Sequence, residues 1–312
     1  MTFTIKLHPS GKLFTAGSES SLLDSALAAG LALPHSCKRG DCSECIATTA
    51  DGESIKTCIT KPESDMELHV DYIAELEGIT QKLLPARVDS VDLRGEVAVL
   101  KLRLPPTAAF KYLPGQYINI KYQGVERSYS IANAGSDGLE LHIARVPDGF
   151  FSTYVFEQCK KNDLLRFEGP FGTSVLRNDS RPLLLVCGGT GFAPMKAMVE
   201  QLLDADDTRP IKLYWGVRHQ DLAYWSIPEG WRSADRLHVE VVVSDQADWS
   251  GRKDWVHQAV LDDIDSVEGW SVFSCGAPPM IDALKNGLVS RGLESNYFYS
   301  DPFLPAEAEK TE

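Results

Sequence analysis

Four of the seven cysteines in this 312-residue chain fall within one short stretch, "CKRGDCSECIATTADGESIKTC". Cys37, Cys42, Cys45 and Cys58 give the spacing C-x4-C-x2-C, followed by a fourth cysteine after twelve further residues. Four thiolates can hold two iron ions, and the spacing of the first three is one that binds [2Fe–2S] clusters. Gly40 gives the loop the backbone freedom to turn its amides inward. The spacing therefore predicts a [2Fe–2S] cluster on these four cysteines.

Zinc is the main competing metal, because four thiolates also make a closed tetrahedral site. Zinc sites usually pair two CxxC knuckles, and only Cys42 and Cys45 form such a knuckle here. A zinc-binding adaptor without enzymatic activity is therefore the less favoured interpretation. Of the three scattered cysteines, Cys187 is expected to pack in a core.

A second chemical pattern is the stretch "RSYSIAN". The Arg127 guanidinium suits the oxygens of a diphosphate. Tyr129 could lie flat on an isoalloxazine ring, and Ser130 could hydrogen-bond flavin N5, the atom that accepts a hydride. A plain edge strand is the alternative interpretation of these residues.

The stretch "HIARVPDGFFSTYVF" follows shortly afterwards. Gly149, Ser152 and Thr153 would place free amides and hydroxyls at the start of a helix, which is a ready anion site. A simple helix N-cap would have the same residues.

A third pattern, "LLLVCGGTGFAPMKAMVEQL", indicates a buried strand, a glycine turn and a helix. Gly188, Gly189 and Gly191 would let a pyrophosphate approach the backbone and the helix N-terminus. The pattern is not GxGxxG, so the Rossmann fingerprint is absent.

The elements that must position these residues fall into three blocks. The first contains an alternating strand, "FTIKLH", a helix, "SLLDSALAAG", and a strand, "DMELHV", after the cysteine loop. The second is a series of short β-rich segments between Gly, Pro and Asp turns, interrupted by one helix, which favours a small antiparallel barrel. The third alternates strands and helices, which predicts a parallel sheet covered on both faces.

The fold class expected is thus multidomain: an α+β domain around the cysteine loop, an antiparallel β-barrel domain and an α/β parallel-sheet domain. The family resemblance described below implies that these are, in order, a ferredoxin-like (β-grasp) [2Fe–2S] domain, an FAD domain and an NAD(P)H domain. The expected boundaries are 1–75 for the first domain, 76–83 for a linker, 84–178 for the barrel and 179–312 for the nucleotide domain.

Composition narrows the functional class. The net charge of −13 disfavours nucleic acid as a partner, because phosphate binding needs a basic surface. The apolar runs are too short to span a membrane, and the N-terminus lacks the regions of a signal peptide. The odd cysteine count argues against disulfides. A cytoplasmic location is expected.

The quoted motifs carry a family resemblance. "SLLDSALAAGLALPHSCKRGDCSEC" and "CITKPESDMEL" resemble a plant-type ferredoxin domain, and they identify Cys58 as the fourth ligand. Ser43 stands where that family usually has Gly, and the segment between the third and fourth ligands is much shorter than usual. The shorter cover should expose the cluster more and shift its potential.

The whole chain resembles the ferredoxin–NADP reductase superfamily, whose RxYS, G-x-x-S, "PGQYINI", GGTGxxP and C-G-x-P-x-M patterns occur in the expected order. The resemblance implies FAD rather than FMN. It places Cys275 beside nicotinamide C4, with Gly276, Pro278 and Met280 shaping the pocket, Arg218 near the adenosine end and Phe303 over the flavin ring. NADH is slightly favoured over NADPH. Catalytic roles fall to Ser130 and Cys275. The remaining implied cofactor contacts are Arg127, Ser128, Tyr129, His142, Ile143, Arg145, Gly149, Phe151, Ser152, Thr153, Gly189, Thr190 and Gly191.

The implied function is an NAD(P)H-dependent electron-transfer reductase. Hydride passes to FAD, and single electrons then pass through the [2Fe–2S] cluster to an acceptor protein. Two subfamilies look similar: reductase components of Rieske-type or diiron oxygenases, placed first on family size, and CDP-6-deoxy-3,4-glucoseen reductases, which serve a dehydrase in deoxysugar synthesis. If the shortened loop holds no cluster, an NAD(P)H-flavin reductase or diaphorase is the alternative.

Overall fold

The computed structural model describes residues 1–35, 38–41, 44–135 and 138–303. The chain divides into two compact units. The first comprises Met1–Thr80 together with Phe171–Arg177, and the second comprises Gln81–Pro170 and Asn178–Glu312. This division into two units does not decide the domain boundaries expected from the sequence, which remain predictions.

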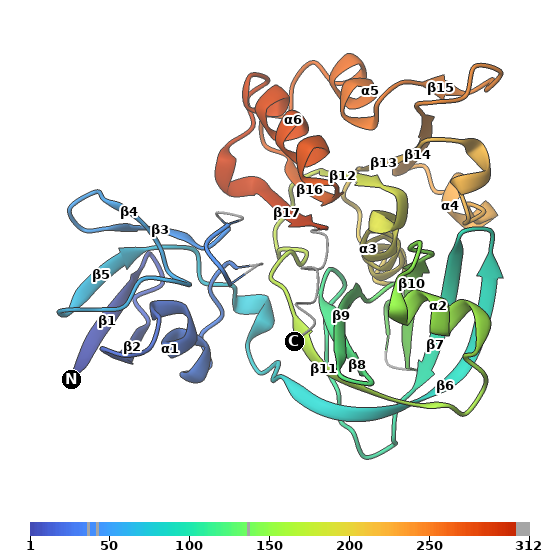
Figure 1. Ribbon diagram of the computed structural model, residues 1–312. Coiled ribbons are helices and arrows are strands. Elements are labelled where there is room, and N and C mark those ends of the chain that lie inside the picture. Colours follow the sequence, from blue (N-terminus) through green and yellow to red (C-terminus); the bar gives the residue numbers. More distant parts are fainter. Residues whose placement is uncertain (36–37, 42–43, 136–137, 304–312) are drawn as a thin grey trace. The chain divides into compact units, whose positions relative to one another are not determined.

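The first unit is a five-stranded sheet in the order β2-β1-β5-β3-β4, with one helix (Figure 1). The alternation in β1 buries Ile5 and Leu7 completely, because successive side chains point to opposite faces. Ser21 caps the helix by accepting a hydrogen bond of 3.0 Å from the Asp24 amide. The elements are β1 (Thr2–His8), β2 (Leu13–Gly17), α1 (Leu22–Ala28), β3 (Ile46–Thr49), β4 (Ser54–Lys56), β5 (Met66–His69) and the 3-10 turn η1 (Ala74–Leu76).

The first part of the second unit is a six-stranded sheet in the order β10-β7-β6-β11-β8-β9. An antiparallel bridge between Ile131 and Leu141 links the chain after β9 to β10, so the two ends of the sheet meet and close it into a barrel. Its apolar interior includes Val88, Leu100 and Phe167. The elements are β6 (Lys82–Arg94), β7 (Val97–Arg103), β8 (Tyr117–Tyr122), β9 (Val125–Ser130), β10 (Leu139–Ala144), α2 (Phe150–Glu157) and β11 (Leu164–Phe171).

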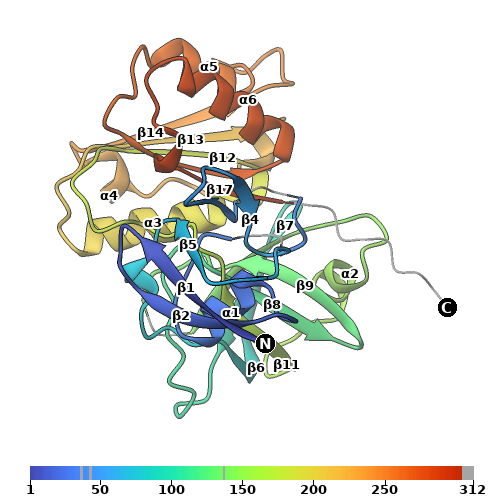
Figure 2. The same cartoon turned by 90° about the vertical axis from the view of Figure 1, so that its left-hand side faces the viewer.

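The second part of this unit is a six-stranded sheet in the order β15-β14-β13-β12-β16-β17, and all its pairs are parallel. Helices α5 and α6 lie on one face and α3 on the other, as both views show (Figures 1 and 2). Two covered faces explain why "LLLVC" in the central strand is buried throughout. The elements are β12 (Leu183–Gly188), η2 (Gly189–Gly191), α3 (Phe192–Asp204), β13 (Ile211–Val217), η3 (Gln220–Leu222), α4 (Glu229–Arg232), β14 (Leu237–Val243), β15 (Arg252–Lys253), α5 (Val256–Asp263), β16 (Ser271–Gly276), α6 (Pro278–Val289), η4 (Ser295–Tyr297) and β17 (Phe298–Pro302).

The fold class expected from the sequence is confirmed: a β-grasp unit, an antiparallel barrel and an α/β unit with a parallel sheet. None of the helices in the described ranges combines the length and the apolar character that crossing a bilayer requires.

Candidate functional site

The two described cysteines of the predicted cluster converge. The Sγ atoms of Cys45 and Cys58 lie 3.1 Å apart, and the residues are 2% and 8% exposed. Two thiolates bound to one tetrahedral ion at about 2.3 Å lie about 3.8 Å apart, so the two sulfurs are close enough for one metal ion to bind both after a small separation. Cys37 and Cys42 lie outside the described residues, and within the described ones no group of three or more ligand side chains forms a metal site.

The short segment between these two cysteines is a β-hairpin. Strands β3 and β4 pair Ile46 with Lys56, and the Thr57 amide donates to the Cys45 carbonyl at 2.9 Å. The residues directly before and after the hairpin are therefore neighbours in space, which brings the two ligands together without a long loop. Figure 1 shows this hairpin at the edge of the first unit.

Backbone contacts also shape the loop that leads to these cysteines. Gly40 has φ +88°, a left-handed conformation that favours glycine, and the Lys56 ammonium donates to its carbonyl. Within the same compact unit, the Thr173 hydroxyl accepts from the His35 amide and donates to the His35 carbonyl, both at 3.0 Å. Hydrogen bonds from Thr173 to the backbone of His35 thus fix the chain where it enters the ligand loop.

The residues predicted to contact the flavin lie on β9, paired antiparallel with β8. Tyr129 is half-buried against the barrel core, and burial raises the pKa of its phenol, so the hydroxyl stays protonated. Ser130 is 6% exposed, whereas Ser128 is exposed and donates to Asn119 Oδ1 at 2.7 Å. Arg127 donates to the Glu126 carbonyl at 2.8 Å. The strand therefore presents a guanidinium and hydroxyls from adjacent positions, a donor set that suits a flavin and its phosphates.

The turn before α2 is tightly packed. A Cβ on Gly149 would lie 2.6 Å from Ser152 Oγ, so only glycine fits there. The Ser152 hydroxyl donates within this turn, toward the Gly149 carbonyl at 3.0 Å, and so stabilises the turn itself. Arg145 and Thr153 line a cavity of about 420 Å³ beside it. Phe151 is 3% exposed and packs in the barrel core.

The glycine turn after β12 packs directly on the segment that carries Cys275. A Cβ on Gly191 would lie 2.4 Å from the Cys275 carbonyl oxygen. Gly189, at φ +54°, would meet nothing within 4 Å, so open space lies over the turn. The buried Trp215 fixes this turn, because its indole Nε1–H donates to the Gly189 carbonyl at 2.9 Å. An open face at the N-terminus of a helix suits the phosphates of a dinucleotide.

The Cys275 thiol is completely buried, and burial raises its pKa well above the ordinary value, with a further contribution from the Asp301 carboxylate. The group is therefore a neutral thiol. Gly276 ends the strand, and its carbonyl accepts a 2.8 Å hydrogen bond from the Phe303 amide. Pro278 and Met280 lie in the first turn of α6, and a Cβ on Gly188 would come within 3.2 Å of Met280 Sδ.

Arg218 directly follows β13, and Thr190 lies in the middle of the η2 turn. The Arg218 side chain is exposed, and its carbonyl accepts a 2.8 Å hydrogen bond from the Asp245 amide. Both residues lie at the carboxyl ends of parallel strands, where ligands bind in open α/β sheets.

Three family profiles match consecutive parts of this chain. A 2Fe-2S iron-sulfur cluster binding domain matches residues 5–70, an oxidoreductase FAD-binding domain matches residues 88–175, and an oxidoreductase NAD-binding domain matches residues 185–286. "Protein RfbI" of Salmonella typhimurium is 44% identical, over 97% of this chain and 97% of that protein. The chain belongs to the iron–sulfur flavoprotein reductases.

Other members of the family are similar over nearly their full length. The CDP-6-deoxy-L-threo-D-glycero-4-hexulose-3-dehydrase reductase of Yersinia pestis is 41% identical, over 98% of this chain and 100% of that protein. Reductase component 2 of a terephthalate 1,2-dioxygenase from Comamonas is 33% identical, over 97% and 98%. A ferredoxin reductase of carbazole 1,9a-dioxygenase superposes with a TM-score of 0.72 at 28% identity, over 97% of this chain and 99% of that one.

The expected family, fold and cofactors are thereby confirmed. This reductase is an NAD(P)H-dependent oxidoreductase, and its cofactors are FAD, a [2Fe–2S] cluster and NAD(P)H. The matched cluster domain favours the [2Fe–2S] cluster over zinc. The individual ligand and cofactor contacts remain predictions.

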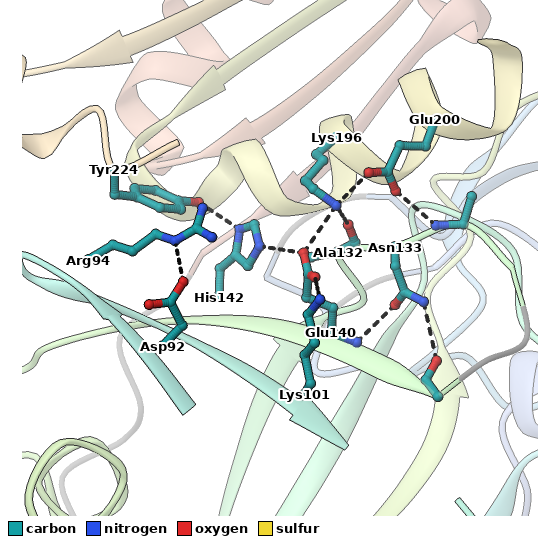
Figure 3. Close-up of polar contacts among 12 residues, drawn as sticks. Asp92, Arg94, Lys101, Ala132, Asn133, Glu140, His142, Lys196, Glu200 and Tyr224 are labelled. Carbon is teal, nitrogen blue, oxygen red and sulfur yellow. Dashed lines mark hydrogen bonds and ion pairs between the residues drawn. The ribbon is translucent and has the colours of Figure 1, made fainter. Parts of the chain in front are cut away.

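Sequence reasoning missed a buried polar network in this reductase, centred on Lys196 of α3 and Glu140 of β10 (Figure 3). His142, predicted as a cofactor contact, takes part in it through both ring nitrogens, and Ile143 is completely buried in the barrel core. One signal was available, because Lys196 is the only charged residue in the otherwise apolar run "FAPMKAMV". A charged residue at a core position indicates a specific buried partner.

Proposed function

We propose that this reductase takes electrons from NADH and delivers them to a dehydrase that acts on a CDP-linked 6-deoxy-4-hexulose. The observation that carries the proposal is the 41% identity to the dehydrase reductase of Yersinia pestis, which spans that whole protein. The similarity to the terephthalate dioxygenase component, at 33%, is lower over a similar length. The expectation from family size placed oxygenases first, and the identities support the reverse order. A cytoplasmic location forms part of the proposal.

FAD, when bound, accepts a hydride at N5, and the cluster carries single electrons onward. In our proposal Arg127, Ser128, Gly149 and Thr153 hold the flavin and its phosphates. Tyr129 lies against the ring system, and Ser130 orients its reacting edge. The nicotinamide lies at the end of the strand that carries Cys275 and Gly276, and the buried neutral thiol supports this site from beneath.

The remaining contacts belong to the nucleotide-binding sheet. The open turn at Gly189 receives the dinucleotide phosphates, and Phe303, tied to Gly276 through its amide, lies at the end of the strand that carries Cys275. The cysteines Cys37, Cys42, Cys45 and Cys58 hold the cluster. The buried thiol bears no charge, so it supports the site without placing a negative charge next to it.

The choice of NADH rests on charge near the adenosine end. Asp245 is hydrogen-bonded to Arg218 through its backbone, and its side chain is 77% exposed beside His219. A 2′-phosphate placed there would meet a carboxylate as well as the guanidinium, which lowers the benefit of the phosphate. The adenosine ribose of NADH has no such phosphate, so this arrangement favours NADH.

The deciding experiment reconstitutes electron transfer with purified components. NADH oxidation is followed anaerobically with the reductase, a hexulose dehydrase and its CDP-sugar. In a parallel mixture supplied with O2, which an oxygenase consumes, it is followed with a Rieske-type oxygenase and its aromatic substrate. We expect NADH consumption matched to deoxygenated sugar product only in the first mixture. Coupled turnover of the oxygenase alone would overturn the proposal in favour of an oxygenase reductase. Turnover with neither acceptor, while free flavin or dyes are reduced, would favour a diaphorase.

A further inference from the structure

The ammonium of Lys196 is completely satisfied by three acceptors in the interior of the second unit. Its side chain is 3% exposed. Nζ lies 3.0 Å from Glu140 Oε1 and 2.6 Å from Glu200 Oε1, and it donates to the Ala132 carbonyl at 2.9 Å. A lysine has three N–H donors, so each proton has one partner. Figure 3 shows the three contacts meeting at one nitrogen.

The acceptors come from two different parts of the unit. Glu140 lies on β10 of the barrel, and Ala132 follows β9, whereas Glu200 lies on α3 itself, one turn after Lys196. Glu200 also bonds to the chain that follows β9, because its Oε2 accepts a hydrogen bond of 3.3 Å from the Ala134 amide. The nucleotide-binding helix is therefore joined to the barrel through charged, directional contacts.

A second connection runs beside the first. Glu140 Oε1 accepts from His142 Nε2 at 3.0 Å, because a carboxylate can only accept. Burial lowers the pKa of His142, so the ring is neutral and its Nδ1 accepts from the Tyr224 hydroxyl at 2.8 Å. The Trp225 ring stacks on His142 with 5.3 Å between ring centroids, and Lys196 Nζ lies 4.6 Å from the centre of the Trp225 ring. Tyr224 and Trp225 follow β13. The nucleotide-binding part therefore contacts the barrel both through Lys196 of α3 and through these two residues.

The residues through which the network contacts the barrel, Ala132 and Glu140, are next to the bridge that closes its sheet. The Ile131–Leu141 bridge joins the two ends of its sheet, and the Ala132 amide donates to the Glu140 carbonyl at 2.8 Å. Ala132 is two residues beyond Ser130, and Lys196 is five residues beyond Gly191. A polar connection from the helix that follows the nucleotide turn to the chain that follows the flavin strand thus runs through the Lys196 ammonium.

We propose that Lys196 is a positioning residue for hydride transfer, which fixes the nucleotide-binding turn relative to the flavin-binding strand β9 through Glu140 and the Ala132 carbonyl. Apolar packing alone would allow the two surfaces to slide, whereas three directional bonds to one nitrogen define both distance and angle. Buried ion pairs add little net stability but can specify a single geometry. Hydride transfer is sensitive to such geometry, since reacting atoms must approach to about 3–3.5 Å.

This inference rests on the proposed roles of Ser130 and Cys275, but it does not depend on the identity of the acceptor protein. It is tested on the holoenzyme in the reductive half-reaction, where NADH reduces the flavin and no acceptor is present. The variants are Lys196→Met and the charge-balanced pair Lys196→Met/Glu140→Gln. Arg209→Met is the matched control: it removes another largely buried cation, whose ion pairs with Asp179 and Asp207 lie outside the barrel.

Stopped-flow reduction of the flavin gives the limiting rate constant and the apparent Kd for NADH. We expect the rate constant to fall between about 10- and 100-fold in both Lys196 variants, because a misplacement of about 1 Å has effects of this size. The Kd should change by less than about 3-fold, since binding contacts are kept. With NADH deuterated at C4, the isotope effect should persist or grow.

A structural measurement accompanies the kinetics. Amide hydrogen exchange of residues 131–134 and 192–200, followed by mass spectrometry, should become faster in both Lys196 variants and stay unchanged in Arg209→Met. A wild-type rate constant in the charge-balanced variant would overturn the proposal, even where Lys196→Met alone does not fold. An equal loss of rate in Arg209→Met would also overturn it, by showing general destabilisation. Failure of the wild type to accept hydride from NADH would instead reject the assignment of the site, while failure with the dehydrase would leave this half-reaction intact.

Discussion

At the scale of single residues, Cys275 has a matched neighbour. Cys187 on β12 pairs with Cys275 on β16, both are completely buried, and burial raises the pKa of both thiols. Each is followed by a glycine that ends its strand, and the carbonyl of Gly276, the glycine after Cys275, accepts a hydrogen bond from the Phe303 amide. The two positions therefore separate the effect of removing a buried sulfur from the effect of altering the support of the nicotinamide site.

We expect Cys275→Ala to slow reduction of the flavin by NADH by about 10-fold or more, because the strand end that holds the nicotinamide in the reacting geometry loses the buried side chain that supports it. Stopped-flow absorbance measures this step, and electron passage from flavin to cluster should keep its rate. Cys187→Ala serves as the control and should leave hydride transfer unchanged. Equal hydride rates in the Cys275 variant and the wild type would remove Cys275 from the catalytic site.

At the scale of elements, the hairpin formed by β3 and β4 explains how a short segment can join the third and fourth ligands, where the resemblance to plant-type ferredoxins led us to expect a longer one. The spacing of the cysteines already indicated four ligands, but not how the third and fourth meet. Pairing of Ile46 with Lys56 places the flanking residues Cys45 and Cys58 side by side. A hairpin also fixes this separation through backbone hydrogen bonds rather than through side-chain packing.

The contact between the nucleotide turn and β16 gives a second prediction. Gly191→Ala would place a methyl group 2.4 Å from the Cys275 carbonyl, so the turn or the strand must move. We expect a loss of about 1–3 kcal/mol in unfolding free energy, as for other overpacked sites, together with weaker NADH binding. Urea unfolding and the NADH dependence of flavin reduction measure the two effects.

Gly230→Ala is the control for this substitution. A Cβ there meets nothing within 4 Å, and the residue lies in helix α4, so alanine should be neutral or stabilising by up to about 1 kcal/mol. If Gly191→Ala behaves like Gly230→Ala, the close packing of the turn on Cys275 is not a constraint on the fold.

At the scale of the whole molecule, local patterns and long-range contacts differed in how far they could be predicted. The cysteine spacing, the glycine turn and the strand alternation each lie within one stretch of sequence, and they predicted the cofactors and all three sheets. The bonds of Lys196 to Ala132 and of His142 to Tyr224 join residues 64 and 82 positions apart. No local periodicity encodes such pairs, because they arise only when the barrel and the nucleotide sheet pack.

The same network makes the stability of the second unit depend on pH. Burial raises the pKa of Glu140, but the bonds from His142 and Lys196 outweigh it and hold the pKa near 2, against 4.5 ordinarily. The folded carboxyl thus binds a proton less tightly than the unfolded one. Its contribution, about 3 kcal/mol, is complete above about pH 4.5 and is lost as the pH falls toward 2. Burial lowers the pKa of His142 below 6.5, so its titration also disfavours the folded state on acidification.

Glu140→Gln tests this dependence. The variant should be less stable than the wild type near neutral pH, and the difference should shrink as the pH falls through the window between about 4.5 and 2, because the wild type alone loses the ionised carboxylate there. All six tryptophans lie between Trp215 and Trp270, so their fluorescence in urea titrations reports on the second unit. Glu168→Gln, which removes a partly exposed partner of Lys121, is the control and should give a curve parallel to the wild type. A constant difference between Glu140→Gln and the wild type from neutral to acidic pH would mean that Glu140 is not held ionised by Lys196 and His142.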